Sequence, residues 1–124
     1  MQSIVHSEIT ILKKSKFQAH YVPLHHKSEI PEILNILQDD KNIRKSTHPH
    51  MYAYIVNSHI GDVGFSDCGE SGAGSRMLTL LQNMKLENVM VIVTRWYGGT
   101  PLGSARFRII SGVVVEVLKK AKVI

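Results

Sequence analysis

The chain has 124 residues, 44% hydrophobic and 20% charged, a composition typical of one globular domain that excludes disordered and collagen-like chains. The longest apolar run, Val89 to Val93, is far shorter than the ~20 residues that cross a bilayer, and no signal-peptide pattern opens the sequence. The lone Cys68 and the lack of an N-x-S/T acceptor favour a reducing interior, cytosol or nucleus, so we expect a cytoplasmic protein.

The formal charge is +5 with the histidines neutral, and it is unevenly distributed. Residues 1–62 carry seven Lys/Arg and six Asp/Glu, whereas residues 63–124 carry eight and four, so the second half holds +4. This excess fits attraction to nucleic acid or to an acidic protein, and it equally fits plain solubility.

The first third of the chain predicts a hairpin and a helix. Residues 7–12 and 16–22 alternate between apolar and polar side chains around a short turn, as strands with one buried face do. Ser28 is a plausible N-cap, and apolar residues follow at helical spacing, so a first helix is predicted over residues 29–40.

The rest of the chain predicts strands and helices in alternation. Residues 51–56 are rich in aromatic and β-branched side chains and form a third strand, while residues 60–65 form a short partner strand or a turn. A second helix buries apolar residues from Met77 to Met84. Residues 88–95 form the most buried strand, covered on at least part of both faces, and residues 104–121 form the last helix.

This order of elements predicts the fold class. Residues 1–124 read as a single domain, without a linker or an internal repeat. Its strands and three amphipathic helices predict an α+β two-layer sandwich, a mixed sheet with helices on one face.

Two histidines near the third strand are candidate metal ligands. His48 and His50 are two residues apart, so they point the same way on an extended strand and could hold a metal together. A zinc site needs further ligands, which only Asp67, Cys68 or Glu70 could supply, and there is no CxxC or HExxH motif. We therefore expect no metal and no cofactor. These histidines are expected to lie at the polar start of the strand.

A glycine-rich segment, residues 67–75, precedes the second helix. The unpaired amides of that helix could bind an anion, although the two carboxylates of the segment disfavour phosphate. The glycine order G-x-x-G-x-G is not that of a dinucleotide loop. In the structural alternative, Asp67 or Ser75 caps the helix and the glycines supply positive φ angles.

Residues 94–104 join the most buried strand to the last helix. Gly98 and Gly103 have the spacing of a Walker A loop, but Ser104 stands where that motif needs lysine, which argues against NTP hydrolysis. Arg95 could stack on a base or clamp a phosphate together with the aromatic residues that follow it. Alternatively, it pairs with Asp67 or Glu70 and holds the two loops together.

No catalytic set is recognisable in the sequence. No serine lies in the context of a nucleophile, and the acidic neighbours of Cys68 weaken its thiol as one. The spacing of Asp67 and Glu70 specifies no reaction, so we expect a protein that is not an enzyme.

Four strings of residues occur in order: Lys14-Ser15-Lys16-Phe17-Gln18-Ala19-His20; Thr47-His48 through Tyr52-Ala53-Tyr54; Asp67-Cys68-Gly69-Glu70 through Ala73-Gly74; and Val93-Thr94-Arg95-Trp96-Tyr97-Gly98-Gly99 with Leu102-Gly103. Together they resemble the IMPACT family, whose bacterial branch is the YigZ-like proteins. The resemblance covers about residues 7–120. Trp96-Tyr97 and Arg106-Phe107 are more similar to the eukaryotic branch, here without its N-terminal RWD domain. Cys68 stands where the family usually has a second Asp.

The resemblance implies a fold like the second domain of ribosomal protein S5 and a role in translation regulation without catalysis. Eukaryotic relatives bind the ribosome-associated activator of the starvation-responsive kinase that phosphorylates initiation factor 2. By competing for this activator they keep the kinase inactive. The expected partner is therefore a protein, with that activator as the candidate. The alternatives are an RNA- or ribosome-binding domain and an uncharacterised enzyme that uses the loops at residues 67–75 and 95–103.

The candidate binding surface combines the second, third and fourth strings. We expect two glycine-rich turns, distant in sequence, to fold side by side and to bring an arginine close to acidic groups. The residues assigned to this surface, for a partner or an anion, are His48, Tyr52, Asp67, Glu70, Gly72, Arg95, Tyr97, Gly98 and Gly99.

Overall fold

The computed structural model describes residues 3–124 and contains a six-stranded sheet. The strands lie in the order β1-β3-β6-β4-β5, and β2 also pairs with β3. Each of these pairings is antiparallel. The strand bounds are β1 Val5–His6, β2 Thr10–Leu12, β3 Ser15–Pro23, β4 His48–Asn57, β5 Asp62–Ser66 and β6 Val89–Trp96.

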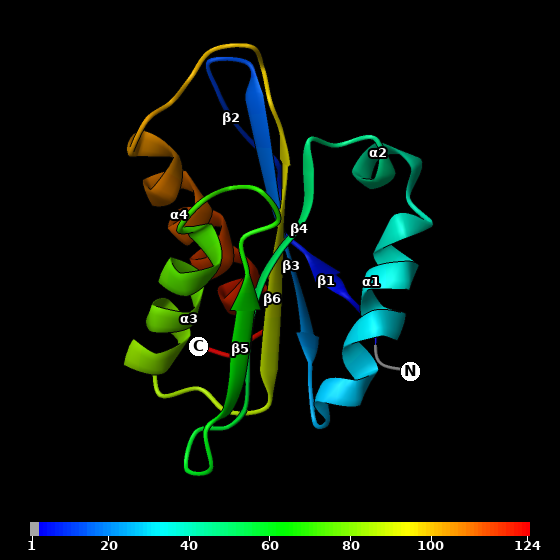
Figure 1. The fold of residues 1–124 in the computed structure, drawn as a ribbon, viewed down its shortest axis with the longest axis vertical. Coiled ribbons are helices and arrows are strands. Elements are labelled where there is room, and N and C mark those ends of the chain that lie inside the picture. Colours follow the sequence, from blue (N-terminus) through cyan, green and yellow to red (C-terminus); the bar gives the residue numbers. More distant parts are fainter. Residues whose placement is uncertain (1–2) are drawn as a thin grey trace.

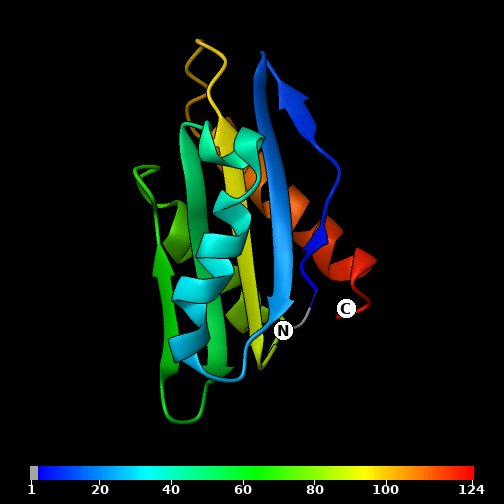
Figure 2. The same cartoon turned by 90° about the vertical axis from the view of Figure 1, so that its right-hand side faces the viewer.

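Helices cover both faces of this sheet (Figure 1). The two long C-terminal helices lie on one face, and a turn of 3-10 helix followed by two shorter helices lies on the other, as the side view in Figure 2 also shows. Their bounds are η1 Lys27–Glu29, α1 Ile30–Gln38, α2 Lys41–Arg44, α3 Ala73–Asn83 and α4 Ala105–Lys120. Within residues 3–124, no helix combines the length and the apolar character needed to cross a membrane.

Strand β6 explains why both faces need a cover. Successive side chains of a strand point to opposite faces, and Val89 to Val93 are all buried. The three valines belong to the core under α3 and α4. Met90 and Ile92 belong to a second core, which α1 and α2 close with Ile30, Ile33, Leu37 and Ile43.

The α+β class predicted from the sequence is confirmed, and two of its details are corrected. The sheet is antiparallel throughout its described pairings rather than mixed in direction. The helices lie on both faces rather than one, because the apolar stripe of α1 packs on the side of the sheet opposite α3 and α4.

Most predicted elements form close to their expected bounds. Residues 60–65 prove to contain a strand, β5, which pairs with β4. The helix predicted over residues 29–40 forms as α1, which ends at Gln38, and α2 is a further short helix that was not predicted. The two helices are divided because the Asp40 carboxylate accepts the amides of Asn42 (2.8 Å) and Ile43 (3.2 Å) and so starts a new helix. This division matters below, since Asp40 borders a cavity.

Candidate functional site

The loop between β5 and α3 is held in shape by Asp67. Its carboxylate accepts the backbone amides of Gly72 (3.0 Å) and Gly74 (2.7 Å), which lie at the start of α3. Gly72 adopts φ 84°, a left-handed conformation that suits glycine. The capping role predicted for Asp67 is confirmed. Glu70, three residues later, is the carboxylate of this loop that does not cap the helix.

Glu70 meets Arg95 at the end of β6. The Arg95 Nη1 donates to both carboxylate oxygens, at 2.8 and 2.7 Å. Glu70 is 6% exposed and Arg95 4% exposed, so this is a buried ion pair that joins the two loops. The structure thereby selects Glu70, rather than Asp67, as the partner of Arg95.

Two further basic groups surround the same carboxylate. Arg106, in the first turn of α4, places its Nε 2.6 Å from Glu70 Oε1, a close ion pair whose N–H is not aligned for a hydrogen bond. His48, at the start of β4, places its Nε2 3.4 Å from Glu70 Oε2. The His48 Nδ1 lies 2.9 Å from the Cys68 carbonyl oxygen, and it donates there because a carbonyl can only accept.

The opposite wall of the site comes from the segment after β6. The Gly98 amide donates to Ser15 Oγ (3.0 Å) at the start of β3. A Cβ at Gly98 would lie 2.2 Å from the backbone carbon of Lys14, so only glycine permits this close approach. The Tyr97 amide donates to Thr47 Oγ1 (3.0 Å), and Tyr97 is 46% exposed at the rim.

These groups border an open cavity of about 440 Å³, lined by Thr47, His48, Glu70, Arg95, Tyr97, Pro101, Leu102, Gly103 and Arg106. Two arginines and one glutamate give its lining a formal charge of +1 with His48 neutral. Both Glu70 oxygens are already in contact with basic nitrogens, so the carboxylate is held in place from several sides. The chemistry that this arrangement favours is recognition of a polar or acidic group.

The structure brings most of the predicted site residues together. His48, Glu70, Arg95 and Tyr97 line the cavity, and the two glycine-rich turns do lie side by side. Asp67, Gly72 and Gly98 shape the loops instead of lining it, and Gly99 lies at a turn with φ 93°. Tyr52 is the exception, because it packs against the second core, on the opposite face of the sheet.

Arg106 is the main site residue that the predicted set omitted; Ser15, Thr47, Pro101, Leu102 and Gly103 were omitted as well. The position of Arg106 in the sequence could have indicated this role. A cation in the first turn of a helix faces the positive end of the helix dipole, so it needs a local anion to compensate. Glu70 is that anion here.

The two candidate metal-ligating histidines diverge. His48 reaches the Cys68 carbonyl and Glu70, whereas His50 Nε2 lies 2.9 Å from Gln38 Nε2, at the end of α1. The register of β4 against β6 shifts between His48 and Met51, and this irregularity breaks the alternation that the sequence prediction assumed. Burial lowers the pKa of His50. Among residues 3–124, no three His, Cys, Asp or Glu side chains gather as metal ligands.

The sequence matches the Impact N-terminal domain family over residues 13–118. This match spans most of the chain and includes each residue that lines the cavity. The chain belongs to the IMPACT family. The resemblance inferred from four short strings is thus confirmed over the whole folded core.

Relatives in the IMPACT family occur across eukaryotes. The yeast family member YDL177C, from Saccharomyces cerevisiae, is 43% identical, with 92% of this chain and 89% of that protein aligned. The Caenorhabditis elegans IMPACT homolog is 38% identical over 94% of this chain but 47% of its own length. Human IMPACT is 37% identical over 86% of this chain and 34% of its own length. The chain therefore spans less than half of the longer relatives.

Two solved structures share the fold. A crystal structure described as that of a hypothetical protein superposes with a TM-score of 0.78 at 21% identity, covering 96% of this chain and 62% of that one. The two-domain translational regulator Yih1 superposes with a TM-score of 0.63 at 30% identity, covering 98% of this chain and 48% of that one. The IMPACT family thus includes a translational regulator.

Proposed function

We propose that this chain regulates translation by binding a protein partner at the cavity around Glu70, without catalysing a reaction. Its membership of a family that includes a translational regulator supports the first half of this proposal. The observation that carries the second half is the Glu70 cluster itself, whose carboxylate is fully engaged by basic nitrogens. Such a cluster is a fixed recognition surface rather than a general base.

The partner that we propose is the ribosome-associated activator of the kinase that phosphorylates initiation factor 2. This choice rests on the resemblance to the eukaryotic IMPACT proteins, and it places the chain in the cytoplasm and in the response to starvation. The exposed Tyr97 ring beside the Arg95 and Arg106 guanidinium groups suits such a contact. Tyrosine and arginine carry much of the binding energy at protein interfaces.

A pull-down from cytosol with the tagged full chain tests this function. We expect wild type to retain the activator together with ribosomal components, and Tyr97→Ala to retain about tenfold less, because the truncation removes an interface anchor. Ile60→Ala is the matched control. Ile60 is 76% exposed, on the turn between β4 and β5 at the other end of the sheet, and its removal should change nothing.

Two results would contradict the proposal. One is that no translation component copurifies with wild type. The other is that Tyr97→Ala and Ile60→Ala retain equal amounts, which would move the binding surface away from the Glu70 cavity.

RNA binding is a second candidate function, and a surface next to the Glu70 cavity favours it. Arg76 on α3 and Arg106 on α4 both lie over the Phe107 ring, 3.9 and 4.3 Å from its centroid. Beside them, a shallow hollow is lined by Arg76, Thr79, Leu80, Asn83, Phe107, Arg108 and Ser111, without an acidic residue in that lining. Two cations and several hydrogen-bonding side chains suit a phosphate backbone.

Titration with single-stranded RNA at about 50 and 200 mM salt tests this candidate. We expect affinity that falls steeply with salt, and Arg108→Ala should weaken binding while flattening the salt dependence. The absence of binding at the lower salt concentration rejects RNA as a ligand of this hollow.

A further inference from the structure

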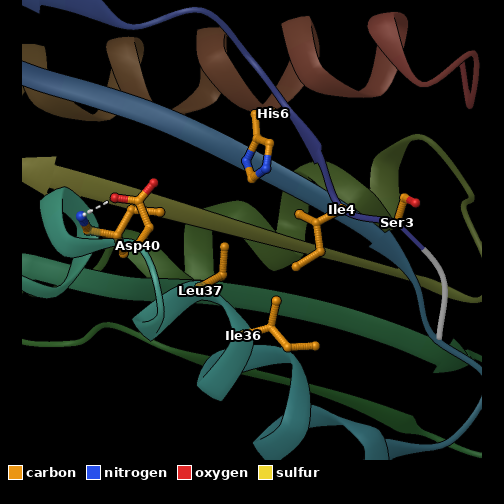
Figure 3. Close-up of a pocket in the computed structure, with 7 residues that line it drawn as sticks. Ser3, Ile4, His6, Ile36, Leu37 and Asp40 are labelled. Atoms are coloured by element: carbon orange, nitrogen blue, oxygen red, sulfur yellow. Dashed lines mark hydrogen bonds between the residues drawn. The ribbon is translucent and has the colours of Figure 1, made fainter.

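A second cavity lies on the other face of the sheet, far from the Glu70 cluster. It measures about 440 Å³ and is lined by Ser3, Ile4, His6, Ile36, Leu37, Asp40 and Ile43. Figure 3 shows the His6 ring projecting from β1 into this space, with the aliphatic side chains below it and Asp40 at one end. Neither the protein binding nor the RNA binding proposed above uses these residues.

Hydrogen bonds behind the cavity fix the protons of His6. Thr94 Oγ1 donates its single proton to the Pro49 carbonyl (2.9 Å), so it must accept from His20 Nε2 (2.9 Å). His20 is buried and its pKa is lowered to about 3, mainly by desolvation, so its ring is neutral and carries that one proton. The other nitrogen of His20, Nδ1, is therefore an acceptor.

The chain of hydrogen bonds continues from His20 to His6, which lines the cavity. His6 Nδ1 lies 2.8 Å from His20 Nδ1 and must donate to it. Burial, and then the nearby Lys120, lower the pKa of His6, so a neutral ring has its remaining lone pair on Nε2. The buried His20–Thr94 pair thus turns His6, which is itself exposed, into a hydrogen-bond acceptor toward the cavity.

Asp40 supplies the charge of the cavity. Its Oδ1 accepts the first amides of α2, and none of residues 3–124 donates to its Oδ2. With His6 neutral, Asp40 is the one charged side chain in the described lining, and the remaining walls are four aliphatic residues and Ser3. Lys120 is outside the cavity lining, and its Nζ donates to the backbone oxygen of His6 (2.8 Å).

We propose that this cavity binds a primary alkylammonium group. The ammonium carries N–H donors for both acceptors, His6 Nε2 and Asp40 Oδ2, and its charge complements the carboxylate. The alkyl body packs against Ile4, Leu37 and Ile43. The same chemistry is offered by a free alkylamine and by a lysine side chain on a partner polypeptide.

NMR of the full chain, labelled in its methyl groups and histidine nitrogens, tests the site. We expect n-butylammonium at constant ionic strength to shift the methyl signals of Ile4, Leu37 and Ile43 in a saturable manner. The His6 Nε2 signal should move as it accepts a hydrogen bond, while His6 Nδ1 stays protonated. These readouts need no variant protein.

A pair of variants tests the charge. Asp40→Asn should weaken binding about three- to fivefold, the effect of losing one exposed ion pair, while keeping α2, because Asn caps helices as well as Asp does. Asp39→Asn, one residue earlier and outside the cavity lining, should leave binding unchanged. N-acetyl-lysine methylamide distinguishes the sources: stronger binding than butylammonium indicates a lysine of a partner, and weaker binding indicates a free amine.

Three outcomes overturn the proposal. The first is that neither amine causes a saturable shift of the methyl signals. The second is that wild type and Asp40→Asn bind the amine with equal affinity. The third is that n-butanol binds as strongly as n-butylammonium. None of them bears on the function proposed for the Glu70 cavity, which lies on the opposite face.

Discussion

Replacing Glu70 with glutamine is expected to lower the free energy of unfolding by about 3–5 kcal/mol. Arg95 is 4% exposed, and its Nη1 donates to both oxygens of Glu70. The amide keeps the shape of the side chain but removes the charge, so the buried guanidinium loses its counter-ion. Domains of this size are stable by about 5–15 kcal/mol, so the change removes a large share of the total. Urea unfolding at pH 7 measures it.

Glu32→Gln is the matched control for this charge removal. Glu32 is exposed in the first turn of α1, and its loss should cost less than about 1 kcal/mol. If Glu70→Gln lowers the free energy of unfolding by less than about 1 kcal/mol, Arg95 has found another partner.

A double-mutant cycle separates the pair from its surroundings. Once Arg95→Met has removed the guanidinium, adding Glu70→Gln should lower the free energy of unfolding by much less than it does in wild type. Some cost remains, because Arg106 and His48 still face the carboxylate. Additive effects of the two changes would show that the ion pair is not a unit.

The elements of this fold could be predicted from the sequence more readily than their layers. The apolar spacing of residues 104–121 predicted α4, which forms at Ala105–Lys120. The stripe of Ile30, Ile33 and Leu37 predicted α1 equally well, but an amphipathic stripe fits either face of a sheet. The decisive signal lay in β6, whose five consecutive apolar residues require a cover on both faces.

The candidate site could be predicted in part for a comparable reason. The two glycine-rich turns were expected to meet, but nothing in the sequence decided whether Asp67 or Glu70 takes Arg95. The choice depends on the start of α3, where the amides of Gly72 and Gly74 engage the Asp67 carboxylate. The predicted alignment of His48 with His50 failed because strand alternation holds only where the register is regular.

Acidification from pH 7 to pH 5 is expected to cost on the order of 2 kcal/mol of stability through His20 alone. The pKa of His20 is lowered from 6.5 to about 3, mainly by desolvation. Between these values the unfolded chain binds a proton that the native ring does not, so stability falls as pH falls. The lowered pKa values of His6 and His50, both mainly caused by burial, act with the same sign.

Urea unfolding at pH 7, 6 and 5 measures this loss, and His20→Gln should reduce the slope by close to one proton at pH 5. This window also separates the histidines from Glu29 and Glu87, whose pKa values are lowered below 4.5 by hydrogen bonds to backbone and to Ser58, respectively. If His20→Gln does not fold, the wild-type ring signals decide instead: titration of His20 near pH 6 would show that the His6–His20–Thr94 array does not exclude the proton.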